Sequence, residues 1–280
     1  MTLTFGSFIT PTASDPEAPV RLAVLSEEVG LDLVTVQDHP YQPGFLDTST
    51  LLAFIGARTE RVHLAANVAN LPLRPPAVLA RAAASLDLLT GGRFELGLGA
   101  GAFWEAIEAM GGPHRAPGEA VTALTEAIAV IRGIWAEEDR TLLRVTGTSY
   151  AVNGAKRGPA PAHDIGIWLG AYQPRMLDIV GRLADGWLPS MSYLGSVEAL
   201  DEGHARIDAA AAKAGRAPES IRRILNISPR EAGFDDLLRL VRDHRIDTLI
   251  LGTDDPGELT RFGRQTAPRL REASAGQGAG

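Results

Sequence analysis

The chain has 280 residues, of which 45% are hydrophobic and 22% are charged, which is enough apolar material for the core of a globular protein. Its formal net charge of −7, and the lack of any run of Lys or Arg, argue against a nucleic-acid partner. There is no cysteine, so disulfides, thiolate catalysis and cysteine-based zinc sites are excluded.

Short apolar segments alternate with helical patterns along the chain. Segments such as Leu33–Val36 lack regular polar alternation, as is typical of parallel strands that are buried on both faces. Strands are expected at residues 2–9, 33–37, 62–67, 94–99, 167–170, 186–189, 224–227 and 248–252. Helices are expected at residues 18–29, 47–58, 76–89, 118–136, 174–184, 196–214, 234–244 and 257–271.

These alternations of strand and helix predict the α/β class, and within it a closed (β/α)8 TIM barrel. We expect a single domain over residues 1–271. An open, doubly wound sheet is the alternative, although that fold more often carries a GxGxxG turn after its first strand, and this chain has none there.

Two segments depart from the repeating pattern. Residues 141–152 follow the fourth helix and alternate around Thr146 to Thr148, which predicts a short hairpin excursion near the barrel rim. Residues 272–280 are small and polar, which predicts a disordered tail.

Polar side chains follow the second strand, where functional groups of such a barrel are expected. Asp38 and His39 place a carboxylate beside an imidazole, a pair that can exchange protons near neutral pH. The alternative is that Asp38 caps a helix and His39 packs into the turn before Pro40.

Three other strand ends carry candidate ligand-binding residues. Asn67 and Val68 end the third strand, and an asparagine can bond the polar edge of a heterocycle. Small residues after the fourth strand admit a ligand close to the backbone; they are Gly99, Ala100, Gly101 and Ala102. A helix opened by Pro174, whose first N–H groups suit a phosphate, is preceded by Gly170, Ala171, Tyr172 and Gln173.

Each of these segments also has a purely structural explanation, as an ordinary loop, a corner glycine or an empty helix start. No HxH, HExxH or GxSxG motif occurs, so neither a metal site nor a serine hydrolase is indicated. With no apolar run of about 18 residues and no leader-like start, we expect a cytoplasmic protein without a membrane span.

Three motifs together resemble the luciferase-like flavin oxidoreductase superfamily. They are VQDHPYQP at 36–43, the segment from NVANLPLRPP to FELGLGAG at 67–101, and LGAYQPRMLDIVGRLADGW at 169–187. That superfamily includes FMN-dependent monooxygenases and enzymes that use the deazaflavin coenzyme F-420. Its members are TIM barrels with insertions, so the resemblance implies the fold that the alternation predicts.

The resemblance also implies roles for individual residues. Asp38 and His39 would face the cofactor ring as catalytic residues, with Asp38 also contacting the cofactor. The Asn67–Val68 peptide bond would be cis and bulge against the ring, and the small residues at 99–102 and the segment 170–173 would bind the side chain and phosphate. Ala102 stands where some deazaflavin dehydrogenases carry a glutamate, which leaves proton transfer to His39.

The function implied is hydride transfer between coenzyme F-420 and a small organic substrate, because Asp-His followed by Gln-Pro is more similar to the deazaflavin branch. One alternative is an FMN-dependent monooxygenase supplied with reduced flavin by a separate reductase. A second alternative is a flavin-binding protein without turnover. The expected partners are a small-molecule substrate and a second copy of the chain in a homodimer.

Overall fold

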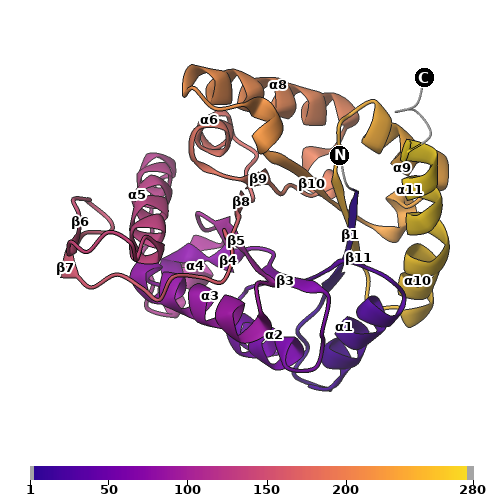
Figure 1. Cartoon of the computed structure of the whole chain (residues 1–280), viewed down its shortest axis with the longest axis horizontal. Coiled ribbons are helices and arrows are strands. Elements are labelled where there is room, and N and C mark those ends of the chain that lie inside the picture. Colours follow the sequence, from indigo (N-terminus) through magenta and orange to yellow (C-terminus); the bar gives the residue numbers. More distant parts are fainter. Residues whose placement is uncertain (1–2, 276–280) are drawn as a thin grey trace.

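The computed structural model describes residues 3–275, and its centre is a closed barrel of parallel strands (Figure 1). Closure follows from the pairing, because β1 pairs with both β2 and β11 while β3 pairs with β5. This confirms the predicted (β/α)8 TIM barrel. In barrel order the strands are β1 (Thr4–Ile9), β2 (Leu33–Val36), β3 (His63–Ala66), β5 (Phe94–Gly99), β8 (Ile167–Leu169), β9 (Gly186–Trp187), β10 (Arg222–Ile227) and β11 (Thr248–Gly252).

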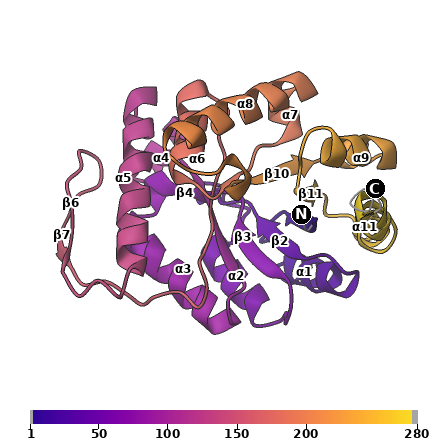
Figure 2. The same cartoon turned by 45° about the horizontal axis from the view of Figure 1, so that its top comes forward.

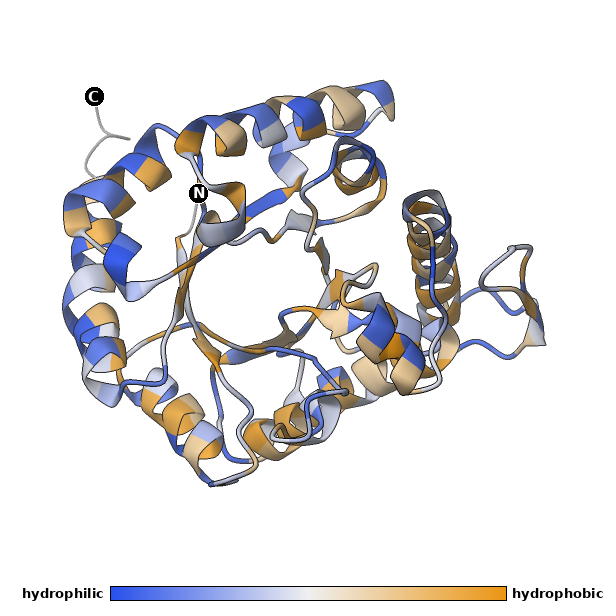
Figure 3. Cartoon of the chain, turned by 180° about the vertical axis from the view of Figure 1, so that it is seen from behind, coloured by the Kyte–Doolittle hydropathy of each residue, from blue (hydrophilic) through white to orange (hydrophobic). Residues whose placement is uncertain are grey.

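Helices surround the ring of strands on the outside (Figure 3). Several begin at a proline, as Pro76, Pro117 and Pro174 do, because the fixed φ of proline suits the first helical turn. The main helices are α1 (Ala18–Glu28), α2 (Thr48–Gly56), α3 (Pro76–Thr90), α5 (Pro117–Trp135), α6 (Pro174–Leu183), α8 (Val197–Lys213), α9 (Phe234–Arg242), α10 (Pro256–Arg261) and α11 (Ala267–Ala275), with the π-helical turn η4 (Phe262–Thr266) joining the last two.

Two apolar clusters make up the core. The larger one lies between the strands and the surrounding helices. The smaller one fills the inside of the barrel, and Phe8 and Val68 pack against it. Phe8 lies near the carboxyl end of β1, and Val68 follows the carboxyl end of β3. Both side chains therefore cover the inner cluster on the side of the predicted site. The buried members of this inner cluster are Leu33, Ala65, Trp168, Leu188, Ile224 and Ile250.

The predicted hairpin is present, with a later second strand. β6 (Leu143–Val145) pairs in antiparallel register with β7 (Val152–Ala155), so the hairpin extends three residues beyond the predicted end at 152. Figures 1 and 2 show it projecting from the barrel beside α5. Its turn is fixed by Glu126 of α5, whose carboxylate accepts backbone N–H groups of residues 148, 149 and 150.

The structure corrects the prediction in two respects. α11 continues to Ala275, so residues 272–275 are helical and the predicted disorder is wrong for them; residues 276–280 lie outside the described residues. The reason is packing, because Leu270 is buried and Arg242 of α9 donates a hydrogen bond to the Ala273 carbonyl. Three short elements were also missed, namely β4 (Ala69–Asn70), α4 (Trp104–Ala109) and α7 (Met191–Leu194).

No helix within residues 3–275 is long and apolar enough to cross a membrane.

Candidate active site

The predicted site residues come together at the carboxyl ends of four neighbouring strands. Asp38 and His39 follow β2, and Asn67 follows β3, while Gly99 ends β5 and Gly170 follows β8. Those strands are adjacent in the barrel, in the order β2, β3, β5, β8. Segments separated by more than a hundred residues in sequence therefore share one sector of the rim.

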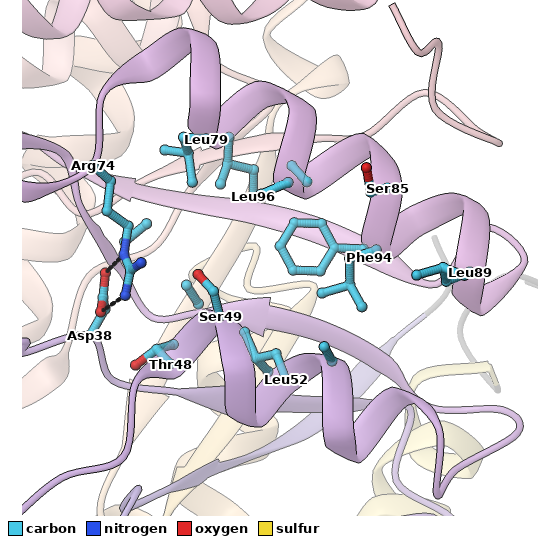
Figure 4. A pocket seen from close by; sticks show the side chains of 16 residues that line it. Asp38, Thr48, Ser49, Leu52, Arg74, Leu79, Ser85, Leu89, Phe94 and Leu96 are labelled. Carbon is cyan, nitrogen blue, oxygen red and sulfur yellow. Dashed lines mark hydrogen bonds and ion pairs between the residues drawn. The ribbon is translucent and has the colours of Figure 1, made fainter.

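Asp38 is buried and fully engaged by a bidentate ion pair. Its Oδ2 accepts from Arg74 Nε at 2.6 Å, and its Oδ1 accepts from Arg74 Nη2 at 2.7 Å (Figure 4). The backbone N–H of Asn70 also donates to Oδ2, at 2.8 Å. Arg74 donates further to Asp47, the residue that caps α2. Asp38 thus ties the end of β2 to the β4 segment and to the start of α2.

His39 has a different hydrogen-bond partner from the one expected. Its Nδ1 lies 2.6 Å from the Tyr41 hydroxyl, and no hydrogen bond joins it to Asp38 among the described residues. Burial lowers the pKa of His39 below its usual value, and the nearby Asp38 carboxylate opposes that shift. The imidazole is therefore held largely neutral at pH 7.

Aromatic rings surround His39. The His39 ring lies 5.4 Å from that of Tyr41 and 5.8 Å from that of Phe103, measured between centroids. Phe103 is 60% exposed and has a φ of 52°, a left-handed conformation that non-glycine residues rarely adopt. The sequence suggested that Phe103 could wall a pocket, but the prediction missed Tyr41, for which its place two residues after His39 was the available signal.

Asn67 belongs to an uncharged polar network across the barrel mouth. Its peptide bond with Val68 is cis, as predicted. The Asn67 amide donates to Asn226 Oδ1 at 2.7 Å and to Thr35 Oγ1 at 3.2 Å, and Asn226 in turn donates to Ser190 Oγ at 3.2 Å. Asn226 was missed, although a lone amide in the apolar strand β10 was a usable signal.

Two glycines of the rim relieve crowding, which is the structural explanation that the sequence analysis gave for a corner glycine. A Cβ built on Gly99 would lie 2.7 Å from Val68 Cγ2, and one on Gly170 would lie 3.4 Å from the same methyl group. Space at both strand ends is thus taken by the Val68 side chain, and ligand approach to these two backbones is limited by it. Gly101, with φ +109°, instead faces the Trp104 ring and Pro72.

The start of α6 is open. Its capping residue Gln173 makes no side-chain capping bond, and the backbone N–H groups of Tyr172 and Gln173 have no acceptor among residues 3–275. The Tyr172 hydroxyl accepts the Ser190 N–H at 3.0 Å, and the Ala171 carbonyl accepts Trp187 Nε1 at 2.8 Å. These bonds fix the loop while leaving the first N–H groups free for an anion.

Two cavities within residues 3–275 lie outside the barrel mouth. One, of about 200 Å³, is an apolar hollow between α2 and α3 that reaches inward to Asp38 and Arg74 (Figure 4). The other, of about 340 Å³, lies at the opposite end of the barrel beside His63, Glu95 and Arg222. No group of three or more His, Asp or Glu within residues 3–275 is arranged to hold a metal ion.

Comparison with known proteins identifies relatives of the whole barrel. The model of a family described as luciferase-like monooxygenase matches residues 1–242. The chain is 34% identical over 220 residues to the 5,10-methylenetetrahydromethanopterin reductase of Methanolobus tindarius, covering 78% of this chain and 63% of that protein. It is also 34% identical over 220 residues to the F420-dependent glucose-6-phosphate dehydrogenase of Nocardia farcinica (strain IFM 10152), covering 76% and 64%.

The chain thus spans somewhat under two thirds of the length of these two relatives. Among solved structures, an F420-dependent secondary alcohol dehydrogenase in complex with an F420-acetone adduct superposes with a TM-score of 0.83. That match covers 96% of this chain and 99% of the other at 16% identity, and so supports the fold alone.

Proposed function

Because the chain belongs to the luciferase-like monooxygenase family, we propose that it is an oxidoreductase that transfers hydride between coenzyme F-420 and a small organic substrate. One relative favours the deazaflavin over FMN, since the glucose-6-phosphate dehydrogenase is named as F420-dependent. The observation that carries the proposal is His39 at the end of β2, whose Nδ1 lies 2.6 Å from the Tyr41 hydroxyl and whose pKa is lowered by burial.

The residues at the rim fit a flavin or deazaflavin. The Asn70 Oδ1 atom is a buried acceptor without a donor among residues 3–275, and the start of α6 offers N–H groups without acceptors. Asn67 and Asn226 provide amides that match the polar edge of a heterocyclic ring. We place the cofactor phosphate at the N–H groups around Ala171–Gln173, where the helix dipole favours negative charge.

The cofactor supplies the hydride chemistry, and the protein supplies orientation and proton handling. His39 is the proposed proton donor or acceptor: a hydrogen bond at Nδ1 to Tyr41 leaves Nε2 for the substrate. In our proposal Tyr41 selects the tautomer of the imidazole, as the partner of one ring nitrogen does generally. Phe103, packed against His39, shields that atom from water.

Asp38 receives a positioning role in this proposal. Both of its oxygens accept bonds from Arg74, and one also accepts the Asn70 N–H, so the carboxylate is held in place at the end of β2 by three hydrogen bonds. Its charge still acts on His39 by making the protonated imidazole less unfavourable. Catalytic proton transfer is accordingly assigned to His39 alone.

The experiment that tests the function is a titration of the purified protein with F-420 and with FMN, followed by fluorescence. We expect micromolar binding of F-420 and at least tenfold weaker binding of FMN, a difference of about 1.4 kcal/mol. Preference for FMN, together with oxygen consumption when a reductase is added, would favour the monooxygenase alternative. Binding without hydride transfer from any reduced or oxidised cofactor would favour the non-catalytic alternative.

We further propose a homodimer through α2 and α3. Four large apolar side chains project from these helices, with Leu89 84%, Val78 65%, Leu88 48% and Phe54 45% exposed. The apolar hollow of about 200 Å³ opens on the same face, so projecting and hollow surfaces coexist there, as a two-fold interface requires. Leu89→Arg is expected to yield a monomer in sedimentation, and an unchanged sedimentation coefficient would contradict this interface.

A further inference from the structure

Arg115 is a buried cation without an anionic partner. It lies in the loop between α4 and α5, two residues before Pro117, and is only 7% exposed. Its Nη1 has no hydrogen-bond partner, and no carboxylate lies within ion-pairing distance of it among residues 3–275. It contacts Tyr150, with the guanidinium carbon 4.8 Å from the ring centroid and a side-chain hydrogen bond to the same tyrosine.

Three other arginines that are buried or partly buried have hydrogen-bond or ion-pair partners within the chain. Arg223, similarly buried, pairs with Asp208, and Arg74 pairs with Asp38 and Asp47. Arg93 donates to four backbone carbonyls and to a threonine hydroxyl. Because burying a charge is costly unless it is paired, the isolation of Arg115 indicates that its partner is a molecule outside the chain.

The position of Arg115 connects it to the candidate active site. The ring it contacts belongs to Tyr150, whose hydroxyl donates to the Leu71 carbonyl at 3.0 Å. Leu71 directly follows Asn70, which pairs with Gly99 at the end of β5 and carries the orphaned Oδ1. Two of the four buried side-chain atoms without partners therefore belong to this one corner of the rim.

The start of α5 adds to the positive potential there. α5 has 19 residues, and its N-terminal end carries the positive pole of the helix dipole one turn from Arg115. The Glu119 carboxylate neutralises part of this pole by accepting the Ala116 N–H at 2.8 Å. The Glu126 carboxylate is engaged by the hairpin turn. Neither forms an ion pair with Arg115.

We propose that Arg115 binds an oxyanion, either a phosphate or a carboxylate. This group would be carried by the ligand that binds at the carboxyl ends of the barrel strands. This inference rests on the proposed function. A guanidinium offers parallel N–H donors that match the oxygens of both groups, and the Tyr150 ring holds its plane in place. The anion is either part of the cofactor side chain, in addition to the phosphate placed at α6, or part of the substrate.

The first test uses stability and inorganic phosphate. The variant is Arg115→Met, which keeps much of the side-chain length and removes the charge, and the control is Arg140→Met, which changes an exposed arginine. Without ligand, Arg115→Met should melt at or above the wild-type temperature, because an unpaired buried charge is removed. Phosphate should raise the melting temperature of the wild type and of Arg140→Met equally, and that of Arg115→Met by a smaller amount, because only the α6 site is then left for the anion.

The second test identifies the source of the anion with matched cofactor pairs. Affinities are measured for FMN and riboflavin, and for F-420 and its deazaflavin core without the phosphate-containing side chain. If Arg115→Met lowers the affinity for FMN or F-420 by tenfold or more and leaves the affinity for the uncharged partner of that pair unchanged, the anion belongs to the cofactor. If Arg115→Met and the wild type bind every cofactor with equal affinity while phosphate stabilises Arg115→Met less than the wild type, the anion belongs to the substrate.

Two further outcomes would contradict either the inference or the proposed function, and they can be told apart. If Arg115→Met lowers the ligand-free melting temperature and responds to phosphate and cofactors as the wild type does, Arg115 is a structural residue and the inference is wrong. If no flavin or deazaflavin binds the wild type, the proposed function fails, and the phosphate experiment still decides the role of Arg115.

Discussion

The two ends of the barrel treat polar groups in opposite ways. At the amino ends of the strands, charges are numerous and paired: Asp87 accepts four hydrogen bonds, and Glu95 accepts the Gly166 N–H and lies 3.4 Å from His163. At the carboxyl ends Asp38 is also paired, with Arg74, but the groups that cross the mouth are amides and hydroxyls, and Asn70 Oδ1 and Arg115 Nη1 lack partners among residues 3–275, as Arg223 Nη1 does at the start of β10.

This difference indicates that the amino ends of the strands serve stability and the carboxyl ends serve function. The larger cavity, of about 340 Å³, lies at the amino ends, where the network of Asp87, Glu95 and His163 is already satisfied. In TIM barrels that end generally serves stability, and the carboxyl ends carry the chemistry. A polar network that is complete holds the fold together, whereas one with unpaired members at the rim is prepared for a ligand.

The largest expected effect is on catalysis at the carboxyl end. His39→Ala should lower the rate of hydride transfer by about 10²–10⁴-fold, because the proposed proton donor or acceptor is lost. Cofactor affinity should stay within a few fold, since the phosphate dominates binding. Single-turnover kinetics with bound cofactor separates the two quantities. A variant that keeps the full rate and loses the cofactor would make His39 a binding residue.

At the amino end the largest effect should be on stability. Asp87→Ala removes a carboxylate that is 0% exposed and accepts from Phe94, Ala162 and His163, so the free energy of unfolding should fall by about 3–5 kcal/mol. The folded fraction should bind cofactor with unchanged affinity. Chemical denaturation and a titration measure these values, and a selective loss of cofactor affinity would break the division between the two ends.

Two rim glycines allow a graded test of the Val68 packing. Gly99→Ala places a Cβ 2.7 Å from a Val68 methyl group, which must move, whereas Gly170→Ala makes an ordinary contact at 3.4 Å. We expect Gly99→Ala to weaken cofactor binding about tenfold, or 1.4 kcal/mol, and Gly170→Ala to weaken it less than threefold. Equal effects in the titration would show that Val68 is not the limiting contact.

The smallest expected effect is a shift in pH dependence. Burial lowers the pKa of His39, so the neutral imidazole persists below pH 6.5, and the acid limb of the rate should lie below that pH. The stability of the fold should also fall with pH in this range. As pH drops below 6.5, His39 takes up a proton in the unfolded chain before it does so in the folded one, which favours unfolding. An acid limb above 6.5, or one that survives in His39→Ala, would contradict this assignment.

The barrel was predictable because its signal is local. Strands such as β5 and β11 are largely apolar, and their bounds agree with the prediction residue for residue. Proline at helix starts and Gly30 and Gly215 after helix ends marked several boundaries, and both glycines have positive φ. The short elements α4 and α7 lack such a signal, because six and four residues are too few for a helical period.

The site was predictable only as a set of segments. Motif position brought Asp38, His39 and Asn67 to one rim, but their partners lie far away in sequence: Arg74 is 36 residues from Asp38, and Asn226 is 159 residues from Asn67. The role of Gly99 depends on where Val68 packs, and the isolation of Arg115 depends on burial by Tyr150. Such facts arise from tertiary contacts, which no local pattern encodes.

The contrast between the two ends leads to one direct measurement, amide hydrogen exchange with and without saturating F-420. The account predicts slower exchange on binding at residues 67–71, 99–104, 115–116 and 171–173, all at the carboxyl-end rim. Exchange at residues 61, 63, 95 and 222, which line the cavity at the amino ends, should be unchanged. Protection at the amino-end cavity with none at the rim would contradict the central claim that the chemistry belongs to the carboxyl ends of the strands.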